Sequence, residues 1–392
     1  MMISHSEALD IVLSTSFRTY TEEIEIDKSI GRILAHDVFS DINMPPFDKC
    51  MVDGYACLKS DIDNEMIIDS IVGAGDGTKY IVDKGHCVKV MTGAPLPNGA
   101  EMVVMIEHVE HISDNKIKVL QKSSNTNISP KGEDIEQGDK VLEKGTKLKP
   151  FHCGILATLG YDKVLVSCQP KIGIIVTGDE IIEPGDKLKE GQIYNSNAYQ
   201  LINNCRSINI DPEYFGIVKD TYEDIESAVK TMIDKKDIVI ITGGVSMGDY
   251  DYVAPVLKNS GLNVRFDSIA AQPGRPIVYA ESDKKFCFGM PGNPVSGLVL
   301  FETIVKHFIY KVQGHDFHPI VHKFTLKKKM TRKKSSRKSY YPVELNNDNT
   351  VSAINYHGSA HLNAYANAYG IIAMERGVLE IEEGEIVDVR QI

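Results

Sequence analysis

The sequence contains no apolar run that approaches the roughly 20 residues a membrane-spanning helix needs, so we expect no membrane segment. Its first residues, MMISHSEALDIVLSTSF, lack a basic region and have only a short, interrupted apolar stretch, which is not typical of a signal peptide. Tryptophan is absent, and the seven cysteines are scattered and include no CxxC pair. This pattern argues against a disulfide framework or a zinc site and favours reduced thiols, so we expect a cytoplasmic protein.

The chain also lacks an excess of basic residues. Its 43 Lys and Arg stand against 54 Asp and Glu, which gives a net charge of −11. A field of this sign does not favour nucleic acid or anionic lipid as a partner, although a local basic pocket can still bind an anion. Neither a Walker loop nor a GxGxxG loop is present, so nucleotide folds of those types are not supported.

Three changes in the pattern of apolar, turn and charged residues along the chain predict its domains. Short apolar runs broken by turn residues over 66–110 predict a small β-rich domain. Strands that alternate with helices after Pro170 predict βαβ units and a mostly parallel sheet. Short strands and turns follow the basic run KKKMTRKKSSRK, for which we expect a solvated edge or hairpin. We therefore expect an α/β multidomain protein with a mixed N-terminal domain (1–46 and 132–169), an inserted β-rich domain (47–131), a central doubly wound α/β domain (170–315) and a β-barrel-like C-terminal domain (316–392).

Capping residues predict where several helices begin. Ser6 precedes the apolar pattern of EALDIVL and is expected to cap the first helix. Asn195 or Ser196 is expected to cap the helix of AYQLINNC. Asn293 is expected to cap the helix that follows GMPG, with Pro294 in its first turn.

Ligands of open parallel sheets bind at the carboxyl ends of the strands, and three such ends carry informative residues. Glycines there let a phosphate approach the backbone, and free N–H groups at a helix start favour an anion. A tight turn at the Gly-Gly pair and a plain cap at Asn293 are the alternative interpretations. The residues concerned are Thr177 to Glu180, then Gly243, Gly244, Ser246 and Asp251, and finally Pro291, Gly292, Asn293, Pro294 and Ser296.

Acidic residues follow three of the predicted strands. Glu180, Asp220 and Asp251 could therefore converge on one rim of the sheet. Hard oxygen ligands near phosphate groups suit Mg²⁺, so we expect a magnesium site there.

A separate stretch, MPPFDKCMVDGYA, holds two acids in a loop stiffened by two prolines. PPFD and DGYA could also be structural turns, so the stretch alone leaves the role of these acids open.

Seven motifs occur in order over most of the chain: MPPFDKCMVDGYA, VMTGAPLPNGAEMVVMIE, GEDI, VTGDE with GQIYNSN, GGVSMGDYDY, QPGRP and MPGNPVSG. Together they closely resemble the molybdopterin molybdenumtransferases, the family that includes the E domain of gephyrin. The resemblance implies an elongated homodimer that inserts molybdate into adenylylated molybdopterin and releases AMP with Mg²⁺. The molybdopterin adenylyltransferase would be a further partner.

The resemblance also implies roles for individual residues. GGVS and PGNPVS would cradle the phosphates of the substrate, and Asp220 and Asp251 would hold Mg²⁺ near Glu180. Asp53, Thr92 and Asp134 would line a cleft opposite Glu180 of the other subunit, so we expect a functional role for Asp53 and a structural role for Asp48.

Some positions depart from the family pattern. Gln272 and Arg275 replace lysines that are candidate contacts for molybdate, and Asn363-Ala364 replaces a serine pair. Arg337 matches the arginine of the oxyanion pocket. The choice between molybdate and tungstate stays open.

Two other functions compete with this one. The related adenylyltransferase also has an α/β domain with GGVS-like loops, but the β domains expected before and after it argue against that activity. A non-enzymatic pterin-binding scaffold would be expected to have lost Asp53, Glu180, Asp220 and Asp251, which are present.

Overall fold

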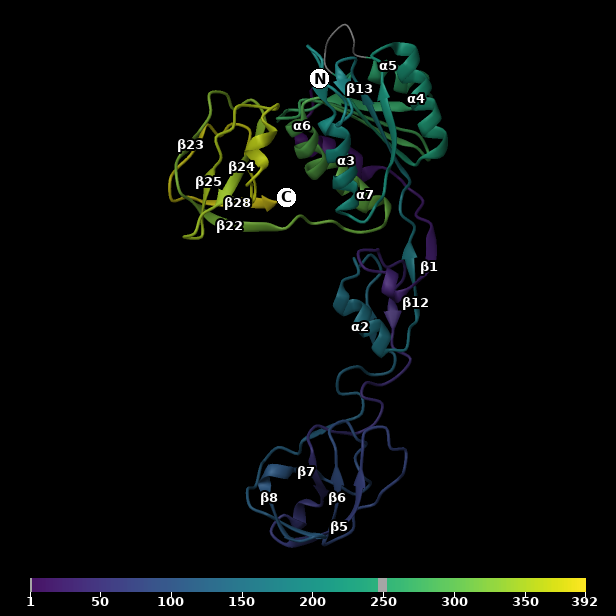
Figure 1. Ribbon diagram of the computed structural model, residues 1–392, viewed down its shortest axis with the longest axis vertical. Helices are drawn as coiled ribbons and strands as arrows, with labels where there is room; N and C mark the ends of the chain where they lie inside the picture. Colours follow the sequence, from purple (N-terminus) through teal and green to yellow (C-terminus); the bar gives the residue numbers. More distant parts are fainter. Residues whose placement is uncertain (1, 246–251) are drawn as a thin grey trace. The chain divides into compact units, whose positions relative to one another are not determined.

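The computed structural model describes residues 2–245 and 252–392, and the chain divides into two compact units (Figure 1). The large unit contains Met1–Ala35, Gly145–Pro150 and Lys163–Ile392. The small unit contains His36–Lys144 and Phe151–Asp162. The limits expected for four separate domains stay predictions. In the described ranges, no helix is long and apolar enough to cross a membrane.

The large unit is built on a six-stranded sheet, and the expected mostly parallel α/β architecture is confirmed. Four neighbouring strands are parallel, and two antiparallel strands extend one edge. The three strands in the middle of the parallel part are buried at every position, as expected for a sheet covered on both faces. In spatial order the strands are β16 (Glu213–Val218), β13 (Ile172–Thr177), β17 (Ile238–Thr242), β21 (Phe286–Met290), β20 (Pro276–Glu281) and β18 (Asn263–Ser268).

Helices cover both faces of this sheet. Successive strand residues point to opposite sides, and both sets are buried and largely apolar. Ile174 belongs to a core cluster with residues of α1, α3 and α7, whereas its neighbour Ile175 belongs to a second cluster with residues of α4 and α5. The sheet is therefore doubly wound, as predicted. The helices are α1 (His5–Ser14), α3 (Ser196–Arg206), α4 (Tyr222–Lys235), α5 (Val253–Asn259), α6 (Pro294–Leu300) and α7 (Lys306–Val312).

The predicted caps have mixed outcomes. The cap of α1 is Ser4 and not Ser6, because Ser4 forms a capping box with Glu7, whereas the residue three positions after Ser6 is Leu9. Asn195 caps α3, since its side chain accepts a hydrogen bond from the backbone N–H of Ala198.

At the next helix, Asn293 occupies the N-cap position of α6, but its side chain makes no capping hydrogen bond. The backbone N–H of Val295 is instead bonded to the carbonyl of Ser359 at 3.1 Å. The expected long helix is also interrupted, because a π-helical turn (Phe301–Val305) separates α6 from α7.

The C-terminal part of the large unit forms a β-barrel. Five strands pair in the order β24, β25, β22, β28 and β26, and the pairing of β26 with β24 closes the ring. The short strand β19 (Ala271–Gln272) adds to β24 in parallel. The basic run contains β23 (Met330–Thr331), which pairs with β27 (Glu380–Ile381) outside the ring. The barrel strands are β22 (Val321–Leu326), β24 (Lys338–Leu345), β25 (Thr350–Ala353), β26 (Gly370–Met374) and β28 (Ile386–Gln391).

Two further strand pairs belong to the large unit. β1 (Thr21–Glu25) runs antiparallel to β12 (Lys163–Ser167), and β14 (Ile181–Ile182) runs parallel to β15 (Ile193–Tyr194). The first pair joins chain segments on either side of the small unit in the sequence.

The small unit contains a second six-stranded sheet, which confirms the expected β-rich region. Its two faces carry separate apolar clusters, one around Cys50 and Val90 and the other around Tyr55 and Ile117. Short pairs flank this sheet, β2 (Val38–Phe39) with β11 (Lys140–Leu142) and β3 (Lys49–Cys50) with β10 (Ile128–Ser129). The sheet order is β7 (Met102–Met105), β4 (Gly54–Cys57), β6 (His86–Val90), β5 (Glu65–Val72), β9 (Lys116–Val119) and β8 (Val109–Ser113). The remaining helix, α2 (Pro150–Thr158), starts at a proline.

We predict that Gly54→Ala destabilises the small unit. A Cβ at this position would lie 2.1 Å from the carbonyl oxygen of Val104, so β4 and β7 would have to separate. The expected loss is about 2–3 kcal/mol in the free energy of unfolding, measured by hydrogen exchange of peptides from residues 36–144. Gly73→Ala is the matched control, because a Cβ there meets nothing within 4 Å. Equal protection in the two variants would contradict the prediction.

Candidate functional site

Two glycine loops meet at the carboxyl edge of the large sheet. The backbone N–H of Gly243 donates to the carbonyl of Met290 at 3.1 Å, and the hydroxyl of Thr242 donates to the carbonyl of Pro291 at 3.2 Å. A Cβ at Gly243 would lie only 2.4 Å from the carbonyl oxygen of Thr177, so this close approach requires glycine. The loops after β17 and β21, predicted to cradle phosphates, therefore lie side by side.

The sequence analysis missed Asn197, which joins these two loops. This α3 residue is buried, and its amide nitrogen donates to the hydroxyl of Thr242 at 2.9 Å and to the carbonyl of Gly292 at 2.8 Å. The sequence did contain a signal for Asn197. It lies one helical turn before Leu201, so it shares the buried face of α3, where a polar side chain needs hydrogen-bond partners.

Asp220 follows β16 at the same edge and is only partly exposed. Burial raises the pKa of its carboxyl group, the side chain of Thr177 offsets part of this rise, and the nearby carboxylates of Glu180 and Asp179 raise the pKa further. Its Oδ1 atom is buried and has no hydrogen-bond partner among residues 2–245 and 252–392. A carboxylate in these surroundings is unfavourable without a cation, so the residues present fit a divalent metal ion.

The complete magnesium set that we predicted stays a prediction, because Asp251 lies outside the described residues. They contain no group of three or more His, Cys, Asp or Glu side chains arranged to hold a metal ion. Two of the predicted residues, Ser246 and Asp251, lie outside the described residues. Asp220, with the exposed Glu180 and Asp179, is the part of the acidic rim that the structure shows.

A cavity of about 300 Å³ lies where the α/β sheet meets the barrel. It brings together Arg275 and Arg337, which were predicted as substrate contacts, with residues of the loop after β21. The segment that carries Asn363-Ala364 contributes Gly358 and Ser359 to its wall. The lining residues are Gln272, Pro273, Gly274, Arg275, Pro276, Pro291, Asn293, Ser296, Arg337, Tyr356, Gly358 and Ser359.

Gln272 has a definite role in this cavity although it carries no charge. Its amide oxygen accepts a hydrogen bond from Nη2 of Arg337 at 3.2 Å. The residue is held in place because β19 pairs in parallel with β24, with Gln272 opposite Ser339. Gln272 thus supplies a neutral acceptor that orients Arg337.

In the small unit, Asp53 and Thr92 are in direct contact. Thr92 donates its backbone N–H at 2.7 Å and its hydroxyl at 2.8 Å to Oδ1 of Asp53. These two hydrogen bonds lower the pKa of the exposed Asp53, which is therefore held as a carboxylate in one orientation.

The other two acids of the small unit differ from Asp53. Asp134 is exposed, and its backbone N–H donates to the carbonyl of Met44 at 2.9 Å. Asp48 accepts a hydrogen bond from the backbone N–H of Lys131 at 2.8 Å, in agreement with the structural role expected for it.

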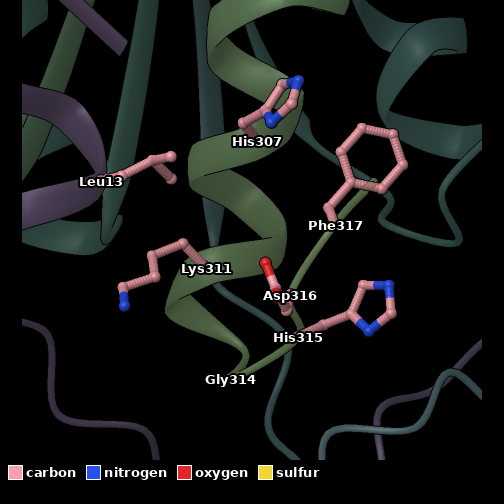
Figure 2. A pocket seen from close by; sticks show the side chains of 7 residues that line it. All are labelled: Leu13, His307, Lys311, Gly314, His315, Asp316 and Phe317. Atoms are coloured by element: carbon pink, nitrogen blue, oxygen red, sulfur yellow. The ribbon is translucent and has the colours of Figure 1, made fainter. Parts of the chain in front are cut away.

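A second depression of the large unit, of about 400 Å³, contains none of the predicted residues (Figure 2). Burial lowers the pKa of His307 to about 4, so its ring is neutral and accepts a hydrogen bond from Arg390 at 3.2 Å. His315 hydrogen-bonds through Nδ1 to the carbonyl of Gly145 at 2.7 Å. Both histidines are therefore engaged within the fold. The lining residues are Leu13, His307, Lys311, Gly314, His315, Asp316 and Phe317.

Comparison with known proteins places this geometry in a family. A molybdopterin molybdenumtransferase of Haemophilus influenzae is 33% identical over 385 residues, which cover 95% of this chain and 94% of the relative. The enzyme of the same name from Staphylococcus epidermidis is 32% identical over 403 residues, with 99% and 95% covered. The chain belongs to the molybdopterin molybdenumtransferase family. The resemblance inferred from the motifs is confirmed.

Family models and solved structures agree with this membership. The MoeA N-terminal region (domain I and II) matches residues 3–160, a probable molybdopterin binding domain matches 173–311, and the MoeA C-terminal region (domain IV) matches 324–392. The crystal structure of a molybdopterin biosynthesis moeA protein from Pyrococcus horikoshii OT3 superposes with a TM-score of 0.87 at 29% identity, with 100% of both chains covered. Since regions on both sides of the molybdopterin-binding part match this family, the adenylyltransferase alternative is not favoured.

We predict that Asp220→Asn raises thermal stability in a metal-free buffer. The native carboxylate is unfavourable at any pH above its raised pKa, whereas the neutral amide avoids this. The expected rise in the unfolding midpoint is about 2 °C at pH 7.5, and the difference should vanish as the pH falls through the raised pKa. Asp234→Asn, the same change at an exposed site on α4, is the control and should leave the midpoint unchanged. An Asp220 variant that melts at or below the wild-type midpoint would disprove the prediction.

Proposed function

We propose that the protein transfers molybdenum from molybdate to adenylylated molybdopterin and releases AMP in a Mg²⁺-dependent reaction. The observation that carries this proposal is the 300 Å³ cavity in which Arg275 and Arg337 meet the loop after β21. A pair of guanidinium groups supplies planar sets of donors that match a tetrahedral oxyanion. We place the reaction in the cytoplasm, because the seven scattered cysteines include no CxxC pair and favour a compartment in which thiols stay reduced.

The loop after β21 connects the oxyanion site to the phosphate site. Asn293 and Ser296 line the cavity, while Gly292 lies beside Gly243 at the tip of β17. If the phosphate groups of the substrate bind at the glycine loops, its pterin end would therefore lie near the oxyanion in the cavity. This arrangement brings two reactants together, which is the main requirement of a transfer that needs no protein nucleophile.

The acidic rim supports the release of AMP. Asp220 carries the buried Oδ1 atom that fits a divalent ion, and Glu180 and Asp179 add negative charge beside it. A bound Mg²⁺ would neutralise charge on the phosphoanhydride oxygens and so favour cleavage of that bond. The side chains of this rim would hold the ion and keep the phosphate end of the substrate at the sheet edge.

We propose that Asp53, Thr92 and Asp134 act in the same reaction through a second copy of the chain. Thr92 keeps the Asp53 carboxylate ionised and in one orientation, which suits a group that orients an attacking water. The site would then contain Asp53 from one protomer of a homodimer and Glu180 and Asp220 from its partner.

Release of AMP from adenylylated molybdopterin should require both molybdate and Mg²⁺. Arg337→Ala should lower kcat/KM for molybdate roughly tenfold or more, because a charge-assisted contact with the oxyanion is lost. Arg376→Ala, which removes the same charge from an exposed turn, serves as the control and should behave as wild type. Replacing molybdate with tungstate in the same assay gives the preference between the two metals. Turnover without added oxyanion, or binding without turnover, would count against the proposal.

Mixing two inactive variants tests the shared site. Asp53→Asn and Asp220→Asn should each be inactive, whereas co-refolded or co-expressed mixtures should recover about a quarter of the wild-type activity, since half of the dimers would be mixed and each would hold one intact site. A matched mixture of Asp53→Asn with Thr92→Val should recover nothing, because both changes fall in the same half. No recovery in the first mixture would show that each chain works alone.

A further inference from the structure

Arg332 lies in the basic run and binds two separate segments of the barrel. Its Nε donates to the carbonyl of Val378 at 2.7 Å, and its Nη2 donates to the carbonyl of Glu375 at 2.5 Å. Its Nη1 donates to the carbonyl of Arg337 at 2.8 Å and to the hydroxyl of Ser339 at 2.7 Å. One guanidinium therefore ties the turn after β26 to the segment that enters β24.

Arg332 differs from three lysines of the basic run in the kind of partner it has. Lys327, Lys329 and Lys338 each form ion pairs with acidic side chains. Arg332 donates only to neutral oxygens among the residues that the structure describes, so its charge is not compensated there. Only the planar arginine side chain presents donors in three directions with fixed geometry, and a lysine at this position would reach fewer of these acceptors.

The contacts of Arg332 determine where Arg337 lies. The carbonyl of Arg337 is held by Arg332, and its guanidinium is held by Gln272. The next residue, Lys338, donates its backbone N–H to the carbonyl of Ala270 at 3.0 Å. Arg337 is thus held at its main chain by Arg332 and at its tip by Gln272, on the wall of the cavity.

We propose that Arg332 is a positioning residue for oxyanion binding, which acts by holding Arg337 towards the cavity. The inference rests on the proposed function, because it assigns the cavity to molybdate. Pre-ordering Arg337 lowers the entropy that is lost when the oxyanion binds.

The test is a double-mutant cycle with molybdate binding to the full-length chain as the readout, measured by equilibrium dialysis without pterin. Arg332→Ala and Arg337→Ala should each weaken binding roughly tenfold. The double variant should bind no more weakly than Arg337→Ala, because Arg332 acts through Arg337. Additive losses would overturn the inference, since they would mean that Arg332 acts on the anion or on the fold independently.

Two further variants distinguish a loss of Arg337 positioning from a general defect in folding. Arg332→Lys keeps the charge but loses most of the four hydrogen bonds, so it should also bind molybdate more weakly, with binding measured below its own unfolding temperature so that only folded chains are compared. Arg376→Ala removes a charge from the same 375–378 turn and should bind as wild type. Wild-type affinity in Arg332→Lys would overturn the positioning role. A wild-type protein that binds no molybdate would overturn the oxyanion site itself, and with it this inference.

Discussion

The ligand site of the large unit depends on the close contact between the backbone at Gly243, after β17, and the backbone at Thr177, at the end of β13. The two strands are parallel neighbours, so their carboxyl ends reach the same edge, and a side chain at Gly243 would collide with the carbonyl of Thr177. Because the backbone comes so close, Thr242 and Asn197 can bind the loop after β21. The amides of two loops and the carboxyl group of Asp220 thereby share one rim, where a ligand with phosphate groups and a cation would be bound together.

The large unit also places groups of like charge near one another. Asp220 lies beside Glu180 and Asp179, and Arg275 and Arg337 line one cavity. A cation at the acidic rim would relieve the repulsion among its carboxylates, and the two guanidinium groups offer donors to an oxyanion in the cavity.

The sequence predicted those features whose causes are local. The alternation of strands and helices predicted the parallel sheet, and the Gly-Gly and Pro-Gly-Asn patterns predicted loops at strand ends. The start of α1 was misjudged because Ser4 and Ser6 both precede the apolar pattern, and only the spacing to Glu7 distinguishes them. Asn197 and Arg332 could not be found in this way, since their acceptors lie on distant segments that only the fold brings near. Arg337 was found through the resemblance alone, as the basic run looked like an ordinary solvated edge.

The parallel pairing of β19 with β24 has a consequence for how such a protein can change. The two residues Ala271 and Gln272 continue the barrel from within the α/β part of the chain, opposite Lys338 and Ser339. The spacing between the two arginines is therefore set by a main-chain ladder rather than by side-chain packing. The chain that joins these strands runs through β20, β21, α6 and α7, so the ladder brings the two ends of a long core segment back together. A substitution at Gln272 would therefore change the chemistry of the cavity on a scaffold that the main chain holds in place.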